Sequence, residues 1–156
     1  MERRKLYVIL HNIRSAHNVG SIFRTADGAG VSKIFLSGYT PAPLDRFGRE
    51  NAEIKKTSLG ATETVPFEVV DDITKQILFL QEEGIEVTAV EQTKKAIEYT
   101  TYTPTRDVAF IFGNEVTGVE EEILEVSDTH IQLPMYGTKE SLNVSVCAGI
   151  VLFHFR

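Results

Sequence analysis

The chain has 156 residues, of which 42% are hydrophobic and 24% are charged, with a single cysteine and a formal net charge of −6. This length suits one domain with a real core, no apolar run approaches the length of a membrane span, and one cysteine excludes an intramolecular disulfide. The basic first residues lead directly into a strand-like run without a small-residue cleavage site, so we expect no signal peptide and a cytoplasmic location.

Strand-like and helix-like segments alternate along the whole chain. In chain order the sequence predicts a strand over 5–10, a helix over 18–29, a strand over 33–37, a Gly- and Pro-rich loop over 38–49, a helix over 51–59, a strand over 65–70, a helix over 71–83, strands over 86–90 and 107–112, a helix over 119–126, a strand over 129–133 and a helix over 141–155. This alternation predicts one α/β domain with a mostly parallel sheet and helices on both faces.

The charge is unevenly distributed along the chain. Residues 1–66 contain ten Lys or Arg and six Asp or Glu, whereas residues 67–156 contain six and sixteen. A basic N-terminal half is compatible with contact to phosphates. On charge alone, ordinary solvated surface is the better interpretation, so the class of partner must come from the motifs.

The connection after the first predicted strand, residues 11–24, contains two Arg, two His and two Asn. Ligands of open parallel sheets bind at the carboxyl ends of the strands, and the guanidinium groups of Arg14 and Arg24 match phosphate oxygens. Solvated surface arginines explain the same residues equally well. Asn18 is a candidate cap for the following helix. Because no further residue has ligand spacing to the two histidines, we expect no metal.

Two further connections carry unusual residues. Gly113 and Glu115 follow a buried strand, without the spacing of a P-loop or of a dinucleotide fingerprint, and a tight turn at a helix start explains them simply. After the strand that stops at Pro134, we interpret Ser141 as the cap of the last helix. Asn143 is harder to explain there, because Asn has poor helix propensity. A serine hydrolase is not indicated, since Ser141 lacks a G-x-S-x-G turn.

Taken in this order, the three connections resemble the motifs of the SpoU/TrmH group of SPOUT methyltransferases. The matches are N-x-x-x-x-x-R at 18–24, G-N-E-x-x-G at 113–118, and I-x-L-P-M followed by S-L-N-V-S between 131 and 145. The resemblance extends over essentially the whole chain. It implies one catalytic domain, residues 1–156, without the N-terminal RNA-binding extension of many relatives, together with a C-terminal trefoil knot and a homodimer.

The resemblance also implies transfer of a methyl group from S-adenosylmethionine to a ribose 2′-hydroxyl of tRNA or rRNA. The residues that it places against the cofactor are Val90, Glu91, Gly113, Leu133, Met135, Ser141 and Leu142. The residues that it places at the site of methyl transfer are Asn18, Arg24, Glu115 and Asn143. We expect Glu115 to orient Arg24 or Asn18, and Asn143 to position one of these two. A guanidinium stays protonated, so our hypothesis is that Arg24 holds a phosphate and steadies the developing alkoxide.

The residues expected to contact RNA are Arg14, Arg46 and Arg49. The last two flank Phe47 in the loop over 38–49, and Phe47 either stacks on a base or packs inward. Without an extension domain, the target RNA would be selected by this domain's own surface or by an auxiliary protein. A compact tRNA stem-loop is the more accessible target for a small dimer.

Three alternatives stay open at this point. The first is a non-catalytic RNA-binding or assembly factor with the same fold, although such a protein tends to lose catalytic residues that are intact here. The second is a flavodoxin-like binder of nucleotides or phosphate, which only the loop glycines support. The third is methylation of a base nitrogen or carbon, against which only the resemblance argues.

Overall fold

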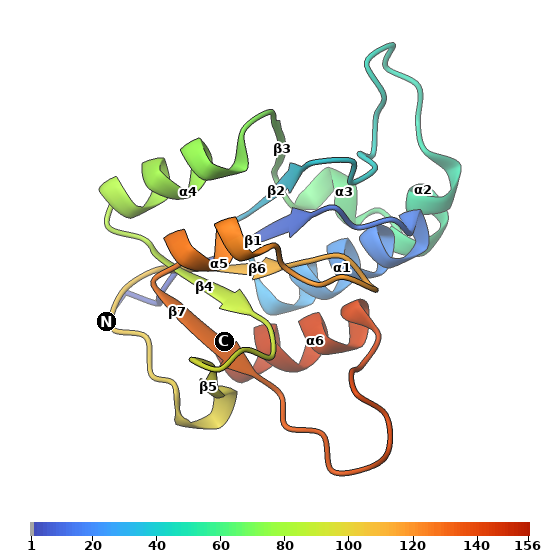
Figure 1. Ribbon diagram of the computed structural model, residues 1–156. Helices are drawn as coiled ribbons and strands as arrows, with labels where there is room; N and C mark the ends of the chain where they lie inside the picture. The colour runs from blue at the N-terminus through green and yellow to red at the C-terminus, as the bar shows by residue number, and fades with distance from the viewer. Residues whose placement is uncertain (1) are drawn as a thin grey trace.

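A parallel β-sheet forms the framework of the computed structural model, which describes residues 2–156 (Figure 1). Within those residues the sheet has seven strands in the order β3-β2-β1-β6-β4-β7-β5, and every neighbouring pair is parallel. The strands are β1 Leu6–His11, β2 Lys33–Ser37, β3 Phe67–Val70, β4 Glu86–Val90, β5 Ile97–Glu98, β6 Val108–Phe112 and β7 Thr129–Gln132. The predicted mostly parallel sheet is confirmed.

Helices cover both faces of this sheet, as the sequence predicts. The helices are α1 Ala16–Ala29, α2 Ala52–Ser58, α3 Ala61–Thr64, α4 Ile73–Glu82, α5 Glu121–Val126 and α6 Val144–His154, with a short 3₁₀ turn at Tyr99–Thr101. Helices α1, α2, α3 and α6 pack on one face, and α4 and α5 pack on the other (Figure 1). None of the helices in residues 2–156 has the length and apolar character needed to cross a membrane.

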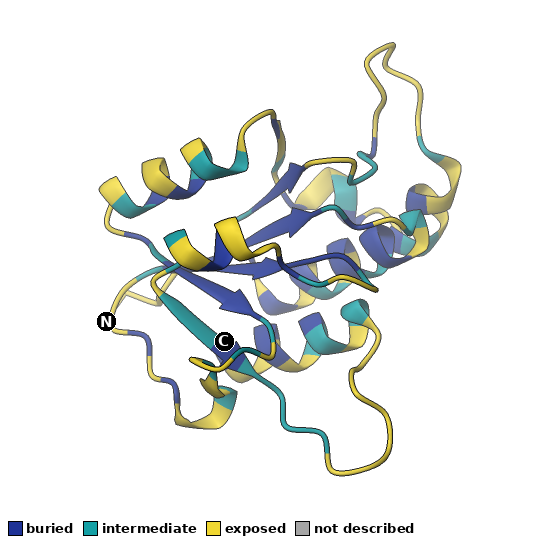
Figure 2. Ribbon diagram, viewed as in Figure 1, coloured by how far each residue is buried: buried dark blue, intermediate teal, exposed yellow. Residues whose placement is uncertain are grey.

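The central strands show why two covering layers are needed. In β1, Leu6, Val8 and Leu10 point into the core beneath α1 and α6, whereas Ile9 points into the core beneath α4 and α5. All five residues of β6 are buried, which is typical of a strand covered on both faces. Figure 2 shows these strands as the buried centre, with exposed residues on the outer sides of the helices.

The start of α1 differs from the prediction that Asn18 caps it. Ser15 has an extended backbone, and its hydroxyl accepts the N–H of Asn18 at 3.1 Å, which makes Ser15 the N-cap. The prediction was wrong because the helix begins at Ala16, two residues before the segment expected from apolar spacing. Gly30, with φ +68°, ends the helix in the left-handed conformation that glycine adopts easily.

The start of α6 also differs from the prediction. Asn143, not Ser141, is the N-cap, because its carboxamide oxygen accepts the N–H of Ser145 at 2.9 Å. The helix therefore begins at Val144, and Ser141 stays in the preceding loop. This arrangement explains an Asn at a helix start in spite of its poor propensity for helix interiors.

The remaining predicted elements agree with the structure to within about two residues at each end, as expected for boundary assignments. Asp72 is the N-cap of α4, because its side chain accepts the N–H of Lys75 at 3.2 Å. Helix α3, strand β5 and the 3₁₀ turn were not predicted, because each is four residues or shorter and has no periodic pattern. Strand β7 lies between β4 and the outermost strand β5, and this order is consistent with the predicted knot.

Candidate active site

The loops after β1 and β6 meet at the carboxyl edge of the sheet through the carboxylate of Glu115. Its Oε1 accepts the backbone N–H of Arg14 at 2.9 Å. Its Oε2 accepts the backbone N–H of Ser15 at 3.0 Å and the side-chain amide of Asn18 at 3.1 Å. One carboxylate therefore fixes the start of α1 against the loop after β6.

The surroundings of Glu115 favour its charged form. Partial burial alone would raise the pKa of this carboxyl, but hydrogen bonds from the backbone of Arg14 and Ser15 and from the Asn18 amide outweigh burial and hold the pKa below its usual value. Glu115 is thus an anion at neutral pH with both oxygens engaged. A carboxylate in this state is a weak proton acceptor.

Asn18 connects Glu115 to the loop that precedes α6. The Asn18 side chain is buried, and its Oδ1 accepts a hydrogen bond from Nδ2 of Asn143 at 3.3 Å. The expected contacts of Glu115 with Asn18 and of Asn143 with Asn18 are therefore both present. The catalytic roles assigned to these three residues stay predictions.

The loop after β6 is a closed turn that only glycine permits at its ends. Asn114 and Gly118 exchange two backbone hydrogen bonds, at 3.1 and 2.9 Å. Oδ1 of Asn114 also accepts the N–H groups of Val116 and Thr117, at 2.8 and 2.9 Å. A Cβ at Gly113 would lie 2.5 Å from the Gly118 carbonyl group, so the strand can turn this tightly only with glycine at that position.

Glu91, directly after β4, holds the far end of the same turn. Its Oε2 accepts the N–H of Val119 at 3.0 Å. Gly118 has φ +71°, and a Cβ there would overlap the Glu91 carboxylate. The turn is therefore fixed by Glu115 on one side and by Glu91 on the other.

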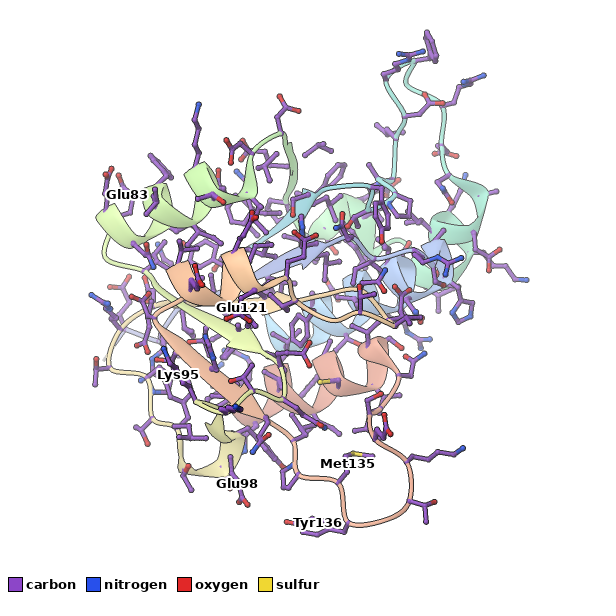
Figure 3. The ribbon with its side chains drawn as sticks, viewed as in Figure 1. Glu83, Lys95, Glu98, Glu121, Met135 and Tyr136 are labelled. Atoms are coloured by element: carbon purple, nitrogen blue, oxygen red, sulfur yellow. The ribbon has the colours of Figure 1, made fainter. Side chains whose placement is uncertain are left out.

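A cleft of about 430 Å³ opens between these loops, and a smaller cleft of about 70 Å³ shares part of its lining. The predicted cofactor residues all line one or both clefts: Val90, Glu91, Gly113, Leu133, Met135, Ser141 and Leu142. Met135 points into the space enclosed by the loop after β7, whereas Tyr136 points away from it (Figure 3). The structure thus brings together residues that the sequence spreads over three connections, those after β4, β6 and β7.

The lining of these clefts fits S-adenosylmethionine. In the described part of the chain, the lining includes the carboxylates of Glu91 and Glu115 but no Lys, Arg or His, so its charge suits a sulfonium cation. The glycines at 113 and 118 leave backbone groups accessible to a ligand. Leu142 and Val144 supply apolar surface.

Cys147 lies in the wall of the cleft and is partly buried. Burial, with a smaller effect from the Glu91 charge, raises the pKa of its thiol to about 12. The thiol is therefore neutral at physiological pH, and a nucleophilic role is not supported.

Arg24 and Arg14 are exposed and do not line the cleft. Six residues of α-helix separate Arg24 from Asn18, a rise of about 9 Å, and they turn Arg24 away from the Asn18 face. Within residues 2–156, no ion pair involves either arginine. Both side chains are therefore free to meet an external anion, and their assignment to phosphate stays a prediction.

Arg46 and Arg49 also lie outside the cleft, in the long connection between β2 and α2. Phe47 between them has 67% of its surface exposed. The alternative that Phe47 packs inward is therefore wrong. All the residues around Phe47, from 44 to 50, are exposed, so there is no buried apolar surface against which the ring could pack.

Asn12, Tyr39 and Glu120 support the site and were not predicted. Asn12 has φ +56°, donates from Nδ2 to Oε1 of Glu120 at 2.9 Å, and accepts the N–H of Tyr39 at 3.2 Å. Tyr39 Oη in turn accepts from Nδ2 of Asn114 at 2.8 Å. An Asn directly after a strand is a weak signal of this backbone conformation, but its partners lie 27 and 108 positions away.

This geometry defines an α/β domain with a cleft built from loops at the carboxyl edge of a parallel sheet. The model of the SpoU rRNA Methylase family matches residues 5–153, and the chain belongs to that family. The resemblance stated from the three motifs is confirmed.

Curated relatives match nearly the whole chain. The 23S rRNA (guanosine-2′-O-)-methyltransferase RlmB of Neisseria meningitidis serogroup B is 36% identical over 151 residues, which cover 97% of this chain and 58% of the relative. The tRNA (guanosine(18)-2′-O)-methyltransferase of Aquifex aeolicus is 32% identical over 161 residues, which cover 98% of this chain and 70% of the relative. The chain thus spans less than two thirds of the length of the RlmB relative.

Solved structures agree with this assignment. The A. aeolicus TrmH/SpoU tRNA modifying enzyme superposes with a TM-score of 0.85 at 29% identity, covering 99% of this chain and 75% of that one. The AdoMet-bound rRNA methyltransferase from Sinorhizobium meliloti superposes with a TM-score of 0.87 at 28% identity, covering 99% of this chain and 57% of that one.

Proposed function

We propose that this chain transfers a methyl group from S-adenosylmethionine to a ribose 2′-hydroxyl of RNA. The observation that carries the proposal is the convergence of all seven expected cofactor residues on adjoining clefts bordered by Glu115 and Asn143. Membership of the SpoU rRNA Methylase family and the activities for which both curated relatives are named support the same reaction.

S-Adenosylmethionine, when bound, supplies a methyl group activated by a positively charged sulfur. The residues that would hold it are Val90, Glu91, Gly113, Leu133, Met135, Ser141 and Leu142. Glu91 and the closed turn after β6 give this cleft its shape before any ligand binds, which reduces the cost of ordering on binding. The protein's own task is then to align the ribose and to manage one proton.

Glu115 acts as a positioning residue in this reaction and not as the general base. Both of its oxygens already accept hydrogen bonds, and its pKa is held below the usual value. Arg24 stays protonated, holds the phosphate beside the target ribose and stabilises the developing alkoxide. A phosphate oxygen or a water molecule takes the proton.

We propose that two copies of the chain form the site together. Helix α6 exposes Val146, Ile150 and Phe153, spaced to lie on one face, beside the part of α1 that carries Arg24. Covering this stripe with a second copy would bring Arg24 of one chain towards the cleft of the other. The dimer would thereby add an arginine to a cleft whose lining, in the described part of a single chain, contains none.

The substrate is a tRNA or rRNA in the cytoplasm, and Arg14, Arg46 and Arg49 contact its backbone. The catalytic unit is the single domain of residues 1–156. We propose that the surface of this domain selects the target RNA; the alternative is that an auxiliary protein selects it. Curated relatives that act on 23S rRNA and on tRNA support both RNA classes.

The first experiment is calorimetric titration of the purified protein with S-adenosylmethionine. The wild type should bind with one site per chain, and Ser141→Tyr, which fills the cleft, should abolish binding. Thr105→Tyr adds the same ring to an exposed position at the amino end of β6 and should bind normally. Absence of binding to folded wild type, or equal loss in both variants, would contradict the proposed cleft.

A further inference from the structure

The connection between β2 and α2 projects from the body of the domain as an arm, residues 41–50, of which residues 44–50 are exposed (Figures 1 and 2). None of its side chains lines the cleft, and the proposed reaction uses only the charge of its two arginines. The tip nevertheless has a defined structure. The proposed function does not account for that structure.

The tip of the arm is a turn organised by Asp45. Oδ1 of Asp45 accepts the N–H groups of Phe47 and Arg49, at 2.8 and 2.9 Å, and the Asp45 N–H donates to the Arg49 carbonyl at 2.9 Å. Gly48, with φ +77°, completes the turn, and Leu44 pairs with Glu50 below it. The tip is therefore preorganised, which lowers the entropic cost of binding.

This turn places two guanidinium groups over the ring of Phe47. The Cζ atoms of Arg46 and Arg49 lie 4.8 and 5.0 Å from the centre of its ring. Nε of Arg49 is fixed to Oδ2 of Asp45 at 2.8 Å, whereas no ion pair within residues 2–156 involves Arg46. Arg46 can therefore leave the ring, while Arg49 stays beside it.

The arm begins at the site itself. Thr40 Oγ1 donates to the Leu10 carbonyl at 2.9 Å and accepts the N–H of Ile13 at 3.1 Å, and Tyr39 contacts Asn114 of the loop after β6. Phe47 is seven residues beyond Thr40 in the chain, a reach of at most about 25 Å. The ring therefore lies within a few nucleotides of any ribose bound at the cleft.

We infer that the arm grips an unpaired nucleotide of the substrate RNA by stacking its base on Phe47. The base takes the ring face that Arg46 leaves, and Arg46 moves to a neighbouring phosphate. Bases inside a duplex are already stacked and cannot reach such a ring, whereas splayed bases of loops stack on aromatic and Arg planes. The inference rests on the proposed function for its partner, RNA, and assigns the substrate class as a loop or single strand.

The test uses RNA oligonucleotides that carry 2-aminopurine, whose fluorescence falls on stacking. The probes are a single strand, a hairpin with the label in its loop, and a duplex, titrated at low salt into the full chain. The wild type should quench the first two probes and leave the duplex unquenched. Phe47→Leu should weaken binding of the single strand about tenfold, Phe47→Tyr should retain it, and Arg46→Gln should weaken it with quenching intact.

A control removes another exposed ring. Phe79→Leu on α4, where Phe79 is 54% exposed on the opposite face of the sheet, should bind as the wild type does. No binding by the wild type, equal affinity of Phe47→Leu, or preference for the duplex would overturn the inference. Phe47-dependent quenching in a protein that neither binds S-adenosylmethionine nor methylates RNA would instead refute the proposed function and leave the arm's role standing.

Discussion

Glu115 holds together segments that lie about 100 positions apart, and its effect should be visible in stability as well as in activity. The Glu115 carboxylate accepts three hydrogen bonds, from two backbone N–H groups and from the Asn18 amide. A Gln at this position has only one accepting oxygen, because its other polar atom is an NH₂ donor. We expect Glu115→Gln to lower the free energy of unfolding by about 1–2 kcal/mol and to reduce methyl transfer more than cofactor affinity. Denaturant unfolding and single-turnover kinetics measure the two effects.

The stability effect of Glu115 should depend on pH in a defined direction. Because the folded pKa lies below the unfolded value of about 4.3, the contribution is fully present above that value and is lost as the pH falls through the folded pKa. The difference between wild type and Glu115→Gln should therefore be constant near neutrality and shrink in acid. The exposed Glu82→Gln should show no such difference, and a pH-independent gap for Glu115→Gln would contradict the assignment.

For single residues, the sequence predicted which side chains belong to the candidate site better than it predicted their hydrogen-bond partners. Glu115, Asn18 and Asn143 stand out as polar residues after strands, and they do contact one another. The backbone donors of Arg14 and Ser15 could not be predicted, because every residue has such a donor and only the folded loop selects two of them. The positive φ of Asn12 was missed for the same reason.

Helix α1 packs so closely on α2 that one glycine decides their separation. A Cβ at Gly20 would overlap the Thr57 hydroxyl and lie 2.9 Å from the Ile54 carbonyl oxygen. We expect Gly20→Ala to lower the free energy of unfolding by about 1–3 kcal/mol, despite the higher helix propensity of Ala. Thermal unfolding of the purified variant measures this loss.

The matched control is Gly149→Ala in α6. A Cβ there meets Thr25 Cγ2 at an ordinary 3.8 Å, so helix propensity should dominate and stability should not fall. Equal stability of Gly20→Ala and the wild type would mean that the two helices are free to separate. The sequence predicted both helices but not this contact, since a glycine inside a helical pattern does not reveal what lies against it.

For the whole molecule, the proposed dimer makes the exposed stripe of α6 the critical surface. Ile150→Glu should convert the protein to a monomer in analytical ultracentrifugation, because a buried unpaired carboxylate opposes association. Leu78→Glu, at an apolar position on α4 that is 48% exposed, should remain dimeric. A monomeric wild type, or dissociation by both variants, would rule out this interface.

A shared site makes a second, sharper prediction. Arg24→Ala and Ser141→Tyr should each abolish methyl transfer, but after the two are mixed and exchange subunits, half of the dimers carry one intact composite site. Activity should then return to about a quarter of the wild-type level. No recovery, with exchange verified, would place Arg24 and the cleft of the same chain in one site.

The parallel sheet and its two helical layers followed from the alternation of segments, but the strand order did not. Strand β7 lies between β4 and β5, and β6 lies between β1 and β4, which local patterns cannot specify because every strand is similarly apolar. The cleft depends on this order, since it places the loops after β4, β6 and β7 side by side. The cleft was therefore predicted from the motif resemblance. The apolar pattern of the individual segments could not predict it, because that pattern does not determine the strand order.

The hydrogen bonds that Glu115 and Asn143 make to the start of α1 and the loop before it join residues 97 to 125 positions apart. Contacts of such long range form slowly, because much of the chain must be ordered before they close. During synthesis the N-terminal part emerges first, so β1 and α1 exist long before Asn143 has left the ribosome. The hydrogen bond between Asn18 and Asn143 can therefore form only after most of the chain has been translated, and a nascent chain arrested before α6 would lack the proposed catalytic site.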